Sequence, residues 1–181
     1  MNEGPLRIAV YGPESTGKTE LARKLAAHFC VPLVEEYARE RWEEQGGALG
    51  LEDMLPISRE QARREDAAAT TGAPLIICDT EALTTMLWSD LLYGTSPDEM
   101  RRTAEKRCRN YALYLLCDID APFAPDPQRC FPDPADREKC MRIWRGALER
   151  RHLPFVDIRG DWAAREATAI AVVKEALPGA L

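Results

Sequence analysis

The sequence has few of the residues that usually mark a metal centre or a membrane segment. Only two of its 181 residues are histidine, and its six cysteines are scattered without a C-x-x-C pair, so we expect no structural zinc site. No stretch approaches the roughly 20 consecutive apolar residues that a membrane-spanning helix needs. The first residues also lack the basic-then-apolar order of a leader peptide. We therefore expect a cytoplasmic protein with reduced thiols.

The sequence also lacks an excess of basic residues. It has 24 Lys and Arg against 30 Asp and Glu, which gives a formal net charge of -6 at pH 7. This charge argues against nucleic acid or an anionic membrane as a partner. Any anionic ligand must be held locally. With 45% apolar residues, residues 1–181 are expected to form a single domain, and the sequence leaves the oligomeric state open.

Two periodicities alternate along the chain. Short apolar runs predict five strands, at residues 6–11, 31–34, 75–78, 112–117 and 154–158. Amphipathic segments predict seven helices, at residues 18–29, 37–44, 57–70, 82–93, 97–107, 137–151 and 161–177, followed by a tail at 178–181. Because helices connect the strands, we expect an α/β fold with three layers, in which a five-stranded parallel sheet is covered on both faces.

The segment 118–136 breaks this pattern, because it holds five prolines and little periodicity. Long loops inside compact domains are often functional lids, so we expect a lid at about residues 119–137. Arg129 and Arg137 are its candidate catalytic residues, since a lid arginine can offset charge on a transferring phosphoryl group. The alternative for each is an ordinary surface arginine.

Residues 12–19 read GPESTGKT and fit the phosphate-loop pattern G-x-x-x-x-G-K-[ST]. The pattern follows a predicted strand and opens a predicted helix, the order in which backbone amides and the positive helix end face a phosphate. Lys18 would then contact the β and γ phosphates of ATP, and Thr19 would coordinate Mg²⁺. The expected nucleotide-binding residues are Gly12, Glu14, Ser15, Thr16, Gly17, Lys18, Thr19 and Glu20.

Acidic residues follow two of the predicted strands, at the edge of the sheet where ligands usually bind. Asp79 ends the third strand and is a candidate metal ligand or catalytic residue, although it could instead cap the next helix. Glu35 and Glu36 end the second strand. We expect Glu36 to accept a proton from, or to orient, a substrate hydroxyl. The alternative is a solvated carboxylate in the first turn of the next helix.

Aromatic residues near these acids suggest a pocket for a planar or cationic ring. Trp88 follows Asp79, and Tyr37 and Trp42 follow Glu36. A tryptophan at helical spacing with leucines can equally belong to the core, and this alternative stays open for Trp88. Asp161 and Trp162 follow the last predicted strand, where they could pack against the adenine of ATP.

Several short segments together resemble the ribosylnicotinamide kinase domain of NadR-type proteins. Besides the phosphate loop they are Glu36-Tyr-Ala-Arg39, Cys78-Asp-Thr80, Leu83-Thr-Thr85, Trp88-Ser89, residues 114–120, Gln128-Arg129, Pro132-Asp133 and Gly160-Asp-Trp162. The resemblance runs from about residue 7 to residue 162. It implies a P-loop NTPase fold like that of nucleoside and nucleotide kinases, and transfer of phosphate from Mg-ATP to the 5′-hydroxyl of nicotinamide riboside.

The resemblance also implies roles for individual residues. Glu36 and Asp79 would face the ribose and the metal, Trp88 or a tyrosine would stack on the pyridinium ring, and Gln128 would belong to the lid. The implied substrate-binding set is Glu36, Tyr37, Arg39, Asp79, Trp88 and Gln128. The lid departs from the family pattern at residues 124–129, which read APDPQR without the expected glycine before the glutamine.

We expect a stand-alone kinase domain, because nothing in the sequence matches the nucleotidyltransferase or DNA-binding domains of full NadR-type proteins. Two other functions stay open. A regulatory P-loop ATPase would use hydrolysis to switch conformation. A nucleoside monophosphate kinase would need more basic residues near the acceptor phosphate than Glu35 and Glu36 suggest.

Overall fold

Five parallel strands form the centre of the computed structural model, which describes residues 4–177. They are β1 (Leu6–Tyr11), β2 (Leu33–Val34), β3 (Leu75–Asp79), β4 (Leu113–Cys117) and β5 (Phe155–Ile158). They lie in the order β2-β3-β1-β4-β5, and each neighbouring pair is parallel. The predicted five-stranded parallel sheet is confirmed. The predicted tail at 178–181 lies outside the described residues.

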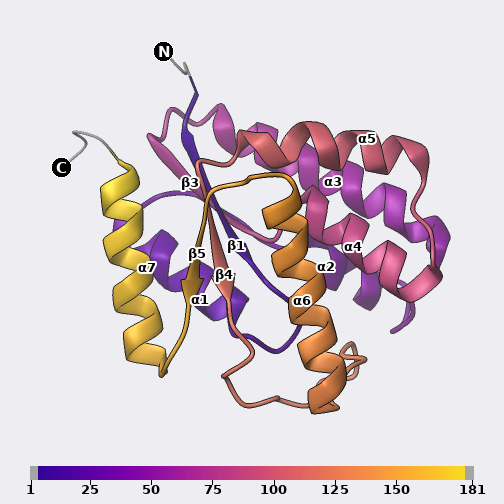
Figure 1. Cartoon of the computed structure of the whole chain (residues 1–181). Coiled ribbons are helices and arrows are strands. Elements are labelled where there is room, and N and C mark those ends of the chain that lie inside the picture. Colours follow the sequence, from indigo (N-terminus) through magenta and orange to yellow (C-terminus); the bar gives the residue numbers. More distant parts are fainter. Residues whose placement is uncertain (1–3, 178–181) are drawn as a thin grey trace.

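Helices cover both faces of the sheet (Figure 1). On one face lie α1 (Lys18–Phe29) and α7 (Trp162–Ala176), which contact each other. The remaining elements are α2 (Tyr37–Glu44), α3 (Leu51–Ala69), α4 (Ala82–Tyr93), α5 (Asp98–Arg107), the short 3-10 helix Cys108–Asn110 and α6 (Pro134–Arg150). The α/β architecture with three layers is therefore confirmed. Within residues 4–177, no helix combines the length and the apolar character needed to cross a bilayer.

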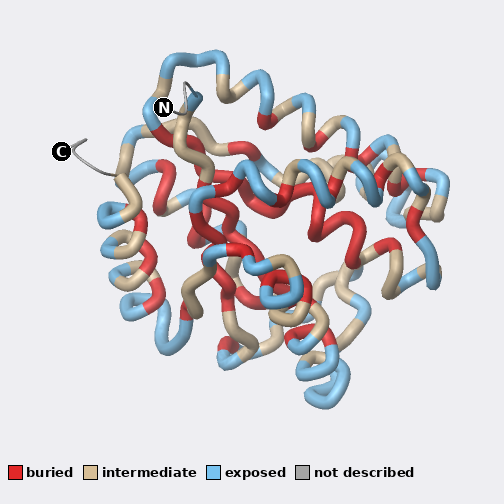
Figure 2. The backbone as a smooth tube through the Cα atoms, turned by 45° about the horizontal axis from the view of Figure 1, so that its top comes forward, coloured by how far each residue is buried: buried red, intermediate tan, exposed pale blue. Residues whose placement is uncertain are grey.

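Strand β1 sends alternate side chains into two separate cores. Ile8 and Val10 pack with apolar residues of α1 and α7. Ala9 and Tyr11 instead pack with a larger cluster drawn from α3, α4, α5 and α6. Figure 2 shows this burial along the central strands, with exposed residues on the outer helix surfaces. The alternation follows from the period of two in a strand.

The order of the strands brings the ends of β1 and β3 side by side. Val10 in β1 is the register partner of Asp79 in β3. The Thr80 amide then donates to the Val10 carbonyl at 3.1 Å. The loop that follows β1 therefore begins next to Asp79, at the edge of the sheet where ligands bind in open parallel sheets.

Helix α3 begins at Leu51, well before the predicted start at Ile57. Pro56 lacks an N–H donor, which is usually unfavourable inside a helix. In the structure Pro56 lies within the helix, the Asp53 carboxylate accepts from the Gly50 amide at 2.9 Å, and Met54 is buried in the core. Capping and packing outweigh the cost of the proline.

Helix α6 begins at Pro134, so the predicted loop at 118–136 is too long. The Asp133 side chain caps the helix by accepting from the Ala135 amide at 2.8 Å, and proline is well suited to the first helical position. Arg137 was predicted to lie in the lid, but it lies in the first turn of α6. We therefore use the name lid for residues 118–133.

We predict that Trp144→Ala lowers the free energy of unfolding by about 3–5 kcal/mol, because it leaves a cavity in place of a buried indole. Trp144 in α6 is fully buried, and its ring centroid lies 4.7 Å from that of Trp88 in α4. Trp144→Phe keeps a ring in the cavity and should lose less. Urea denaturation of both variants tests this, and equal losses would contradict it.

Candidate functional site

The phosphate loop at residues 12–19 connects β1 to α1, as predicted, and its two glycines cannot carry a side chain. Gly12 has a φ of 142°, and a Cβ there would lie 2.7 Å from the Cys117 carbonyl oxygen. Gly17 has a φ of 78°, and its Cβ would lie 2.5 Å from the Trp162 ring. Both positions combine a backbone conformation that favours glycine with a close approach.

The loop presents free hydrogen-bond donors at the start of α1. Gly17 is the residue before the helix, and no side chain caps the first turn, so its amides are available to an anion. Lys18 Nζ donates to the Pro13 carbonyl at 2.6 Å, and the Thr16 hydroxyl donates to the same oxygen at 2.9 Å. The lysine is therefore folded over the loop, where it adds positive charge to the helix end.

Asp79 lies at the end of β3, where it is 1% exposed. Its Oδ1 atom accepts no hydrogen bond from any residue between 4 and 177. Burial raises the pKa of this carboxyl, while the Thr19 hydroxyl and Lys18 act in the opposite direction. A buried carboxylate oxygen without a partner is unusual in a folded protein, and it suits a bound cation.

Glu36 precedes α2 and faces Asp79 across the same edge of the sheet. Burial and the nearby Asp79 carboxylate raise the pKa of Glu36 to about 7, although Lys18 and Arg39 lower it. Ionisation of one acid disfavours ionisation of the other, because two negative charges would then lie close together with little water to screen them. A carboxyl with a pKa near neutrality is suited to general base chemistry.

A single cleft of about 1020 Å³ brings most of the predicted site residues together. This space is large enough for a nucleotide and a small second ligand. The predicted residues that line it are Glu14, Ser15, Thr16, Gly17, Lys18, Thr19, Glu20, Glu36, Arg39, Asp79, Trp88, Gln128 and Arg129. The structure thus joins the phosphate loop, the two acids and part of the lid in one place.

Tyr37 and Arg137, two of the predicted site residues, do not line the cleft. The Tyr37 ring packs against the guanidinium of Arg64, whose Cζ lies 4.6 Å from the ring centroid. Arg137 Nη2 donates to the Ala121 carbonyl at 3.0 Å and the Ser15 carbonyl at 3.4 Å. Arg137 therefore holds the base of the lid against the outer side of the phosphate loop.

The lid is fastened across the cleft to helix α2. Arg39 Nη1 pairs with the Asp126 carboxylate at 2.9 Å and also donates to Gln128 Oε1 at 3.1 Å. Arg129 lies in the same segment and contacts the Ala124 carbonyl. Two predicted substrate-binding residues, Arg39 and Gln128, thus contact each other over the mouth of the cleft.

Trp88 is both a core residue and part of the cleft wall. One edge of its ring packs on Trp144, and a face stacks on Phe131 of the lid with the ring planes 12° apart and the centroids 6.2 Å apart. The two interpretations left open by the sequence therefore both describe this residue. Trp88 thus lines the cleft up to the point where it meets Phe131 of the lid.

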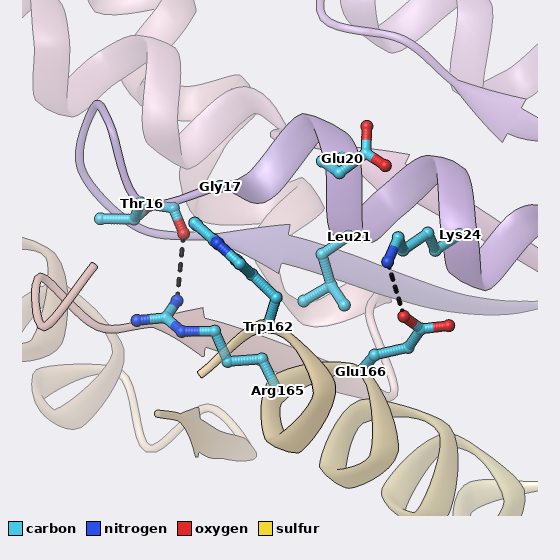
Figure 3. A pocket seen from close by; sticks show the side chains of 8 residues that line it. All are labelled: Thr16, Gly17, Glu20, Leu21, Lys24, Trp162, Arg165 and Glu166. Carbon is cyan, nitrogen blue, oxygen red and sulfur yellow. Dashed lines mark hydrogen bonds and ion pairs between the residues drawn. The ribbon is translucent and has the colours of Figure 1, made fainter. Parts of the chain in front are cut away.

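Trp162 and Arg165 project from the first turns of α7 toward the phosphate loop (Figure 3). Trp162 is 54% exposed although its ring lies against Gly17. Asp161 caps α7 by accepting from the Ala164 amide at 2.8 Å. These two predicted nucleotide-binding residues thus lie on the outer side of the phosphate loop, beside the cleft.

Arg165 was not predicted from the sequence, yet it joins three segments at the site. It donates to the carbonyls of Thr16, Asp118 and Gly160 at 3.1, 3.0 and 2.8 Å, and it also pairs with the Asp120 carboxylate. The sequence signal that could have identified it is an arginine at helical spacing with Ala169 and Val173, one turn after the capping Asp161.

We predict that Arg165→Ala destabilises the protein by at least about 2 kcal/mol, because it leaves the buried Thr16 carbonyl without a donor and removes the contacts with Asp118 and Gly160. The matched control is Arg159→Ala, since Arg159 is 60% exposed and pairs with Asp118 at the surface. This control should lose at most about 1 kcal/mol. Urea denaturation compares the two, and a larger loss for Arg159→Ala would contradict the role given to Arg165.

Comparison with known proteins places the chain among P-loop domains. The family model AAA_28, described as an AAA domain, matches residues 7–165. The trifunctional NAD biosynthesis/regulator proteins NadR of Salmonella typhimurium and Escherichia coli are each 25% identical over 173 residues, which is 93% of this chain. The chain spans 42% of the length of these relatives.

Solved structures share the fold. A NadR protein in complex with NR superposes with a TM-score of 0.73 at 24% identity, over 96% of this chain and 52% of that one. A NadR protein in complex with NAD and AMP-PNP gives 0.77 at 23% identity, over 98% and 51%. Thymidylate kinase from Ehrlichia chaffeensis gives 0.67 at 15% identity, over 94% and 99%. The chain belongs to the AAA_28 family of P-loop domains and is homologous to the NadR proteins.

Proposed function

We propose that this chain is an ATP-dependent kinase that phosphorylates the 5′-hydroxyl of nicotinamide riboside and so yields nicotinamide mononucleotide. The observation that carries the proposal is the single cleft in which a phosphate loop faces the buried Asp79, the half-buried Glu36 and an aromatic wall. The homologous NadR structures, which contain NR in one case and the ATP analogue AMP-PNP in another, support it.

The nucleotide half of the proposed site is the phosphate loop. The amides of residues 12–19 bind the phosphates, and Lys18 exchanges its bond to the Pro13 carbonyl for bonds to phosphate oxygens. The exposed face of Trp162 is available to the adenine ring. Positive charge is thus concentrated at one side of the cleft.

The residues present fit a Mg²⁺ ion that binds together with the nucleotide. Thr19 offers a hydroxyl, and Asp79 offers a buried oxygen without a hydrogen-bond partner among residues 4–177. Within those residues, no three His, Cys, Asp or Glu side chains gather to hold a metal ion by themselves. The remaining ligands would be phosphate oxygens and water, which Mg²⁺ commonly keeps. When bound, Mg²⁺ supplies positive charge that offsets the charge of the phosphates.

The acceptor half of the proposed site is acidic and aromatic. Glu36, with its pKa raised to about 7, accepts the proton of the acceptor hydroxyl as the phosphoryl group is transferred. Trp88 provides a flat wall for the pyridinium ring, whose positive charge suits both the indole and the nearby acids. Glu35 and Glu43 also line the cleft, which makes it unfavourable for an acceptor that already carries a phosphate.

The lid residues complete the proposed site. Arg129 lines the cleft beside Gln128, where it can offset charge on the transferring phosphoryl group. The closed position of the lid over the cleft also excludes water, which would otherwise accept the phosphoryl group from ATP. Both roles depend on the contacts that hold residues 124–131 over the cleft.

The deciding experiment is incubation of the protein with Mg-ATP and a panel of nucleosides, with the mass of the products as readout. Conversion of nicotinamide riboside to its 5′-monophosphate, in preference to the other nucleosides, supports the proposal. Loss of ATP without a phosphorylated acceptor would favour a regulatory ATPase instead. Phosphorylation of a different nucleoside would retain the kinase and correct its acceptor.

Lys18→Ala is predicted to reduce phosphorylation at least about 100-fold, because it removes a positive donor from the phosphates. The urea midpoint of the variant should differ little from that of the wild type, because the Lys18 side chain is only half-buried. Lys106→Ala, an exposed lysine on α5, is the matched control and should keep full activity. A fully active Lys18→Ala variant would remove Lys18 from this role.

The raised pKa of Glu36 predicts how activity depends on pH. The carboxyl must be ionised to accept a proton, so kcat/KM for the acceptor should rise as pH increases through about 7 and then level off. Glu36→Gln should be slow and should lose this rise. An unchanged pH profile in the variant would assign the proton transfer to another group, for which Asp79 is the candidate.

The same pKa predicts an effect on stability. Below the unfolded-state pKa of about 4.3, Glu36 is neutral in both states, so Glu36→Gln should change stability little there. As pH rises from that value through 7, the wild type must bury a charge that the glutamine variant lacks. The variant should therefore become progressively more stable than the wild type, as measured by urea unfolding at pH 4, 6 and 8. A constant difference across this range would contradict the raised pKa.

A further inference from the structure

Glu14 places an acidic side chain inside a loop whose amides are arranged to attract phosphate. Such a carboxylate weakens the positive field of the loop unless it is held elsewhere. In the structure the side chain is half-buried and turned toward the lid. Its presence in the loop therefore needs an explanation other than contact with phosphate.

The Glu14 carboxylate accepts both backbone amides at the end of the lid. Its Oε1 accepts from the Phe131 amide at 2.6 Å and from the Cys130 amide at 2.9 Å, and its Oε2 accepts from Cys130 at 3.1 Å. Hydrogen bonds of an amide to a carboxylate are roughly twice as strong as those between neutral groups. One side chain of the phosphate loop thus fixes two consecutive residues more than a hundred positions away.

The fixed lid segment carries the ring that completes the acceptor wall. Phe131 stacks on Trp88 with nearly parallel rings, and Trp88 lines the cleft beside Thr84 and Thr85. A displacement of the Phe131 backbone would therefore remove the support of the Trp88 ring on its lid side. Glu14 belongs to the phosphate loop, yet it is connected to the acceptor part of the cleft through Phe131 and Trp88.

A neighbouring residue of the same loop holds a different part of the lid. Ser15 Oγ accepts from the Ala124 amide at 2.8 Å, and the Ser15 carbonyl accepts from Arg137. These contacts lie at the beginning of the lid and away from the aromatic wall. Ser15 therefore provides a control for any general loosening of the loop and lid.

We propose that Glu14 is a positioning residue that couples the phosphate loop to the acceptor half of the cleft. It fixes Cys130 and Phe131, and through Phe131 it sets the position of the Trp88 wall. The statement about the acceptor rests on the proposed kinase function, whereas the statement about the lid does not. The class of acceptor concerned is a nucleoside with a planar ring.

Amide hydrogen exchange of the full chain without any ligand tests the lid contact. In Glu14→Ala, the amides of Cys130 and Phe131 should exchange at least about tenfold faster than in the wild type, because they lose a charged acceptor. In Ser15→Ala, faster exchange should appear at Ala124 and not at these two residues. Glu14→Gln keeps one oxygen acceptor and should give an intermediate rate.

Kinetics with nicotinamide riboside and ATP test the coupling. Glu14→Ala should raise KM for the riboside at least about fivefold, while KM for ATP stays equal or falls, because a negative charge leaves the phosphate loop. Glu14→Gln should recover much of the loss. A role limited to loop stability would instead raise KM for ATP.

The outcomes separate the two proposals. Unchanged exchange at Cys130 and Phe131 in Glu14→Ala would overturn the inference, whether or not the chain is a kinase. A raised KM for ATP with an unchanged KM for the riboside would also overturn it. A wild-type protein that phosphorylates no nucleoside would refute the proposed function, while faster exchange in the variant would still support the lid contact.

Discussion

The close approach of the phosphate loop to the end of strand β4 is the constraint on which the rest of the site depends. At Gly12 the backbone passes so near the Cys117 carbonyl that a Cβ would lie 2.7 Å from that oxygen. This approach directs the loop across the edge of the sheet, so that α1 begins with its uncapped amides beside Asp79. Arg165 of α7 holds the same loop by donating to the Thr16 carbonyl. The anion-binding geometry is therefore fixed by packing between strands and does not depend on a bound phosphate.

The distribution of charge explains how an acidic chain can hold an anion. The net charge of -6 is distributed over the surface, and solvent and salt screen its effect on a distant ligand. A phosphate in the loop would instead lie in direct contact with oriented amides and Lys18, and these close contacts decide whether it binds. Next to these donors, in the same cleft, burial raises the pKa values of Glu36 and Asp79. The cleft therefore joins a positive phosphate loop to an acidic and aromatic part lined by Glu35, Glu36 and Trp88. This polarity suits the proposed phosphate donor at the loop and the proposed uncharged or cationic acceptor at the acidic part.

Features encoded within a few residues could be predicted from the sequence. The strand, loop and helix around residues 12–19 follow from apolar runs, two glycines and a lysine, and the parallel sheet follows from the alternation of strands and helices. The placement of Asp79 and Glu36 in one cleft also follows, because parallel strands end at the same edge. These predictions needed only local patterns and one topological rule.

Two helix starts and several contacts between segments distant in sequence were missed. Helix α3 was predicted from Ile57, but the cap from Asp53 and burial of Met54 start it at Leu51, before Pro56. Asp133 and Pro134 start α6 early and remove Arg137 from the lid. The contacts of Arg165 with Thr16, Asp118 and Asp120, and those of Glu14 with the lid, join residues 45 or more positions apart. No local pattern specifies such pairs.

The lid is held by contacts on two sides of the cleft. On the α2 side it is held by the pair of Arg39 with Asp126, and Arg39 is 42% exposed, so this contact contributes at most about 1 kcal/mol. On the loop side, the Glu14 carboxylate accepts from the amides of Cys130 and Phe131. The lid is therefore held over the cleft from two sides, by α2 and by the phosphate loop. Each contact is formed by a residue that also lines the cleft, so the residues that hold the lid are those that a bound ligand would meet.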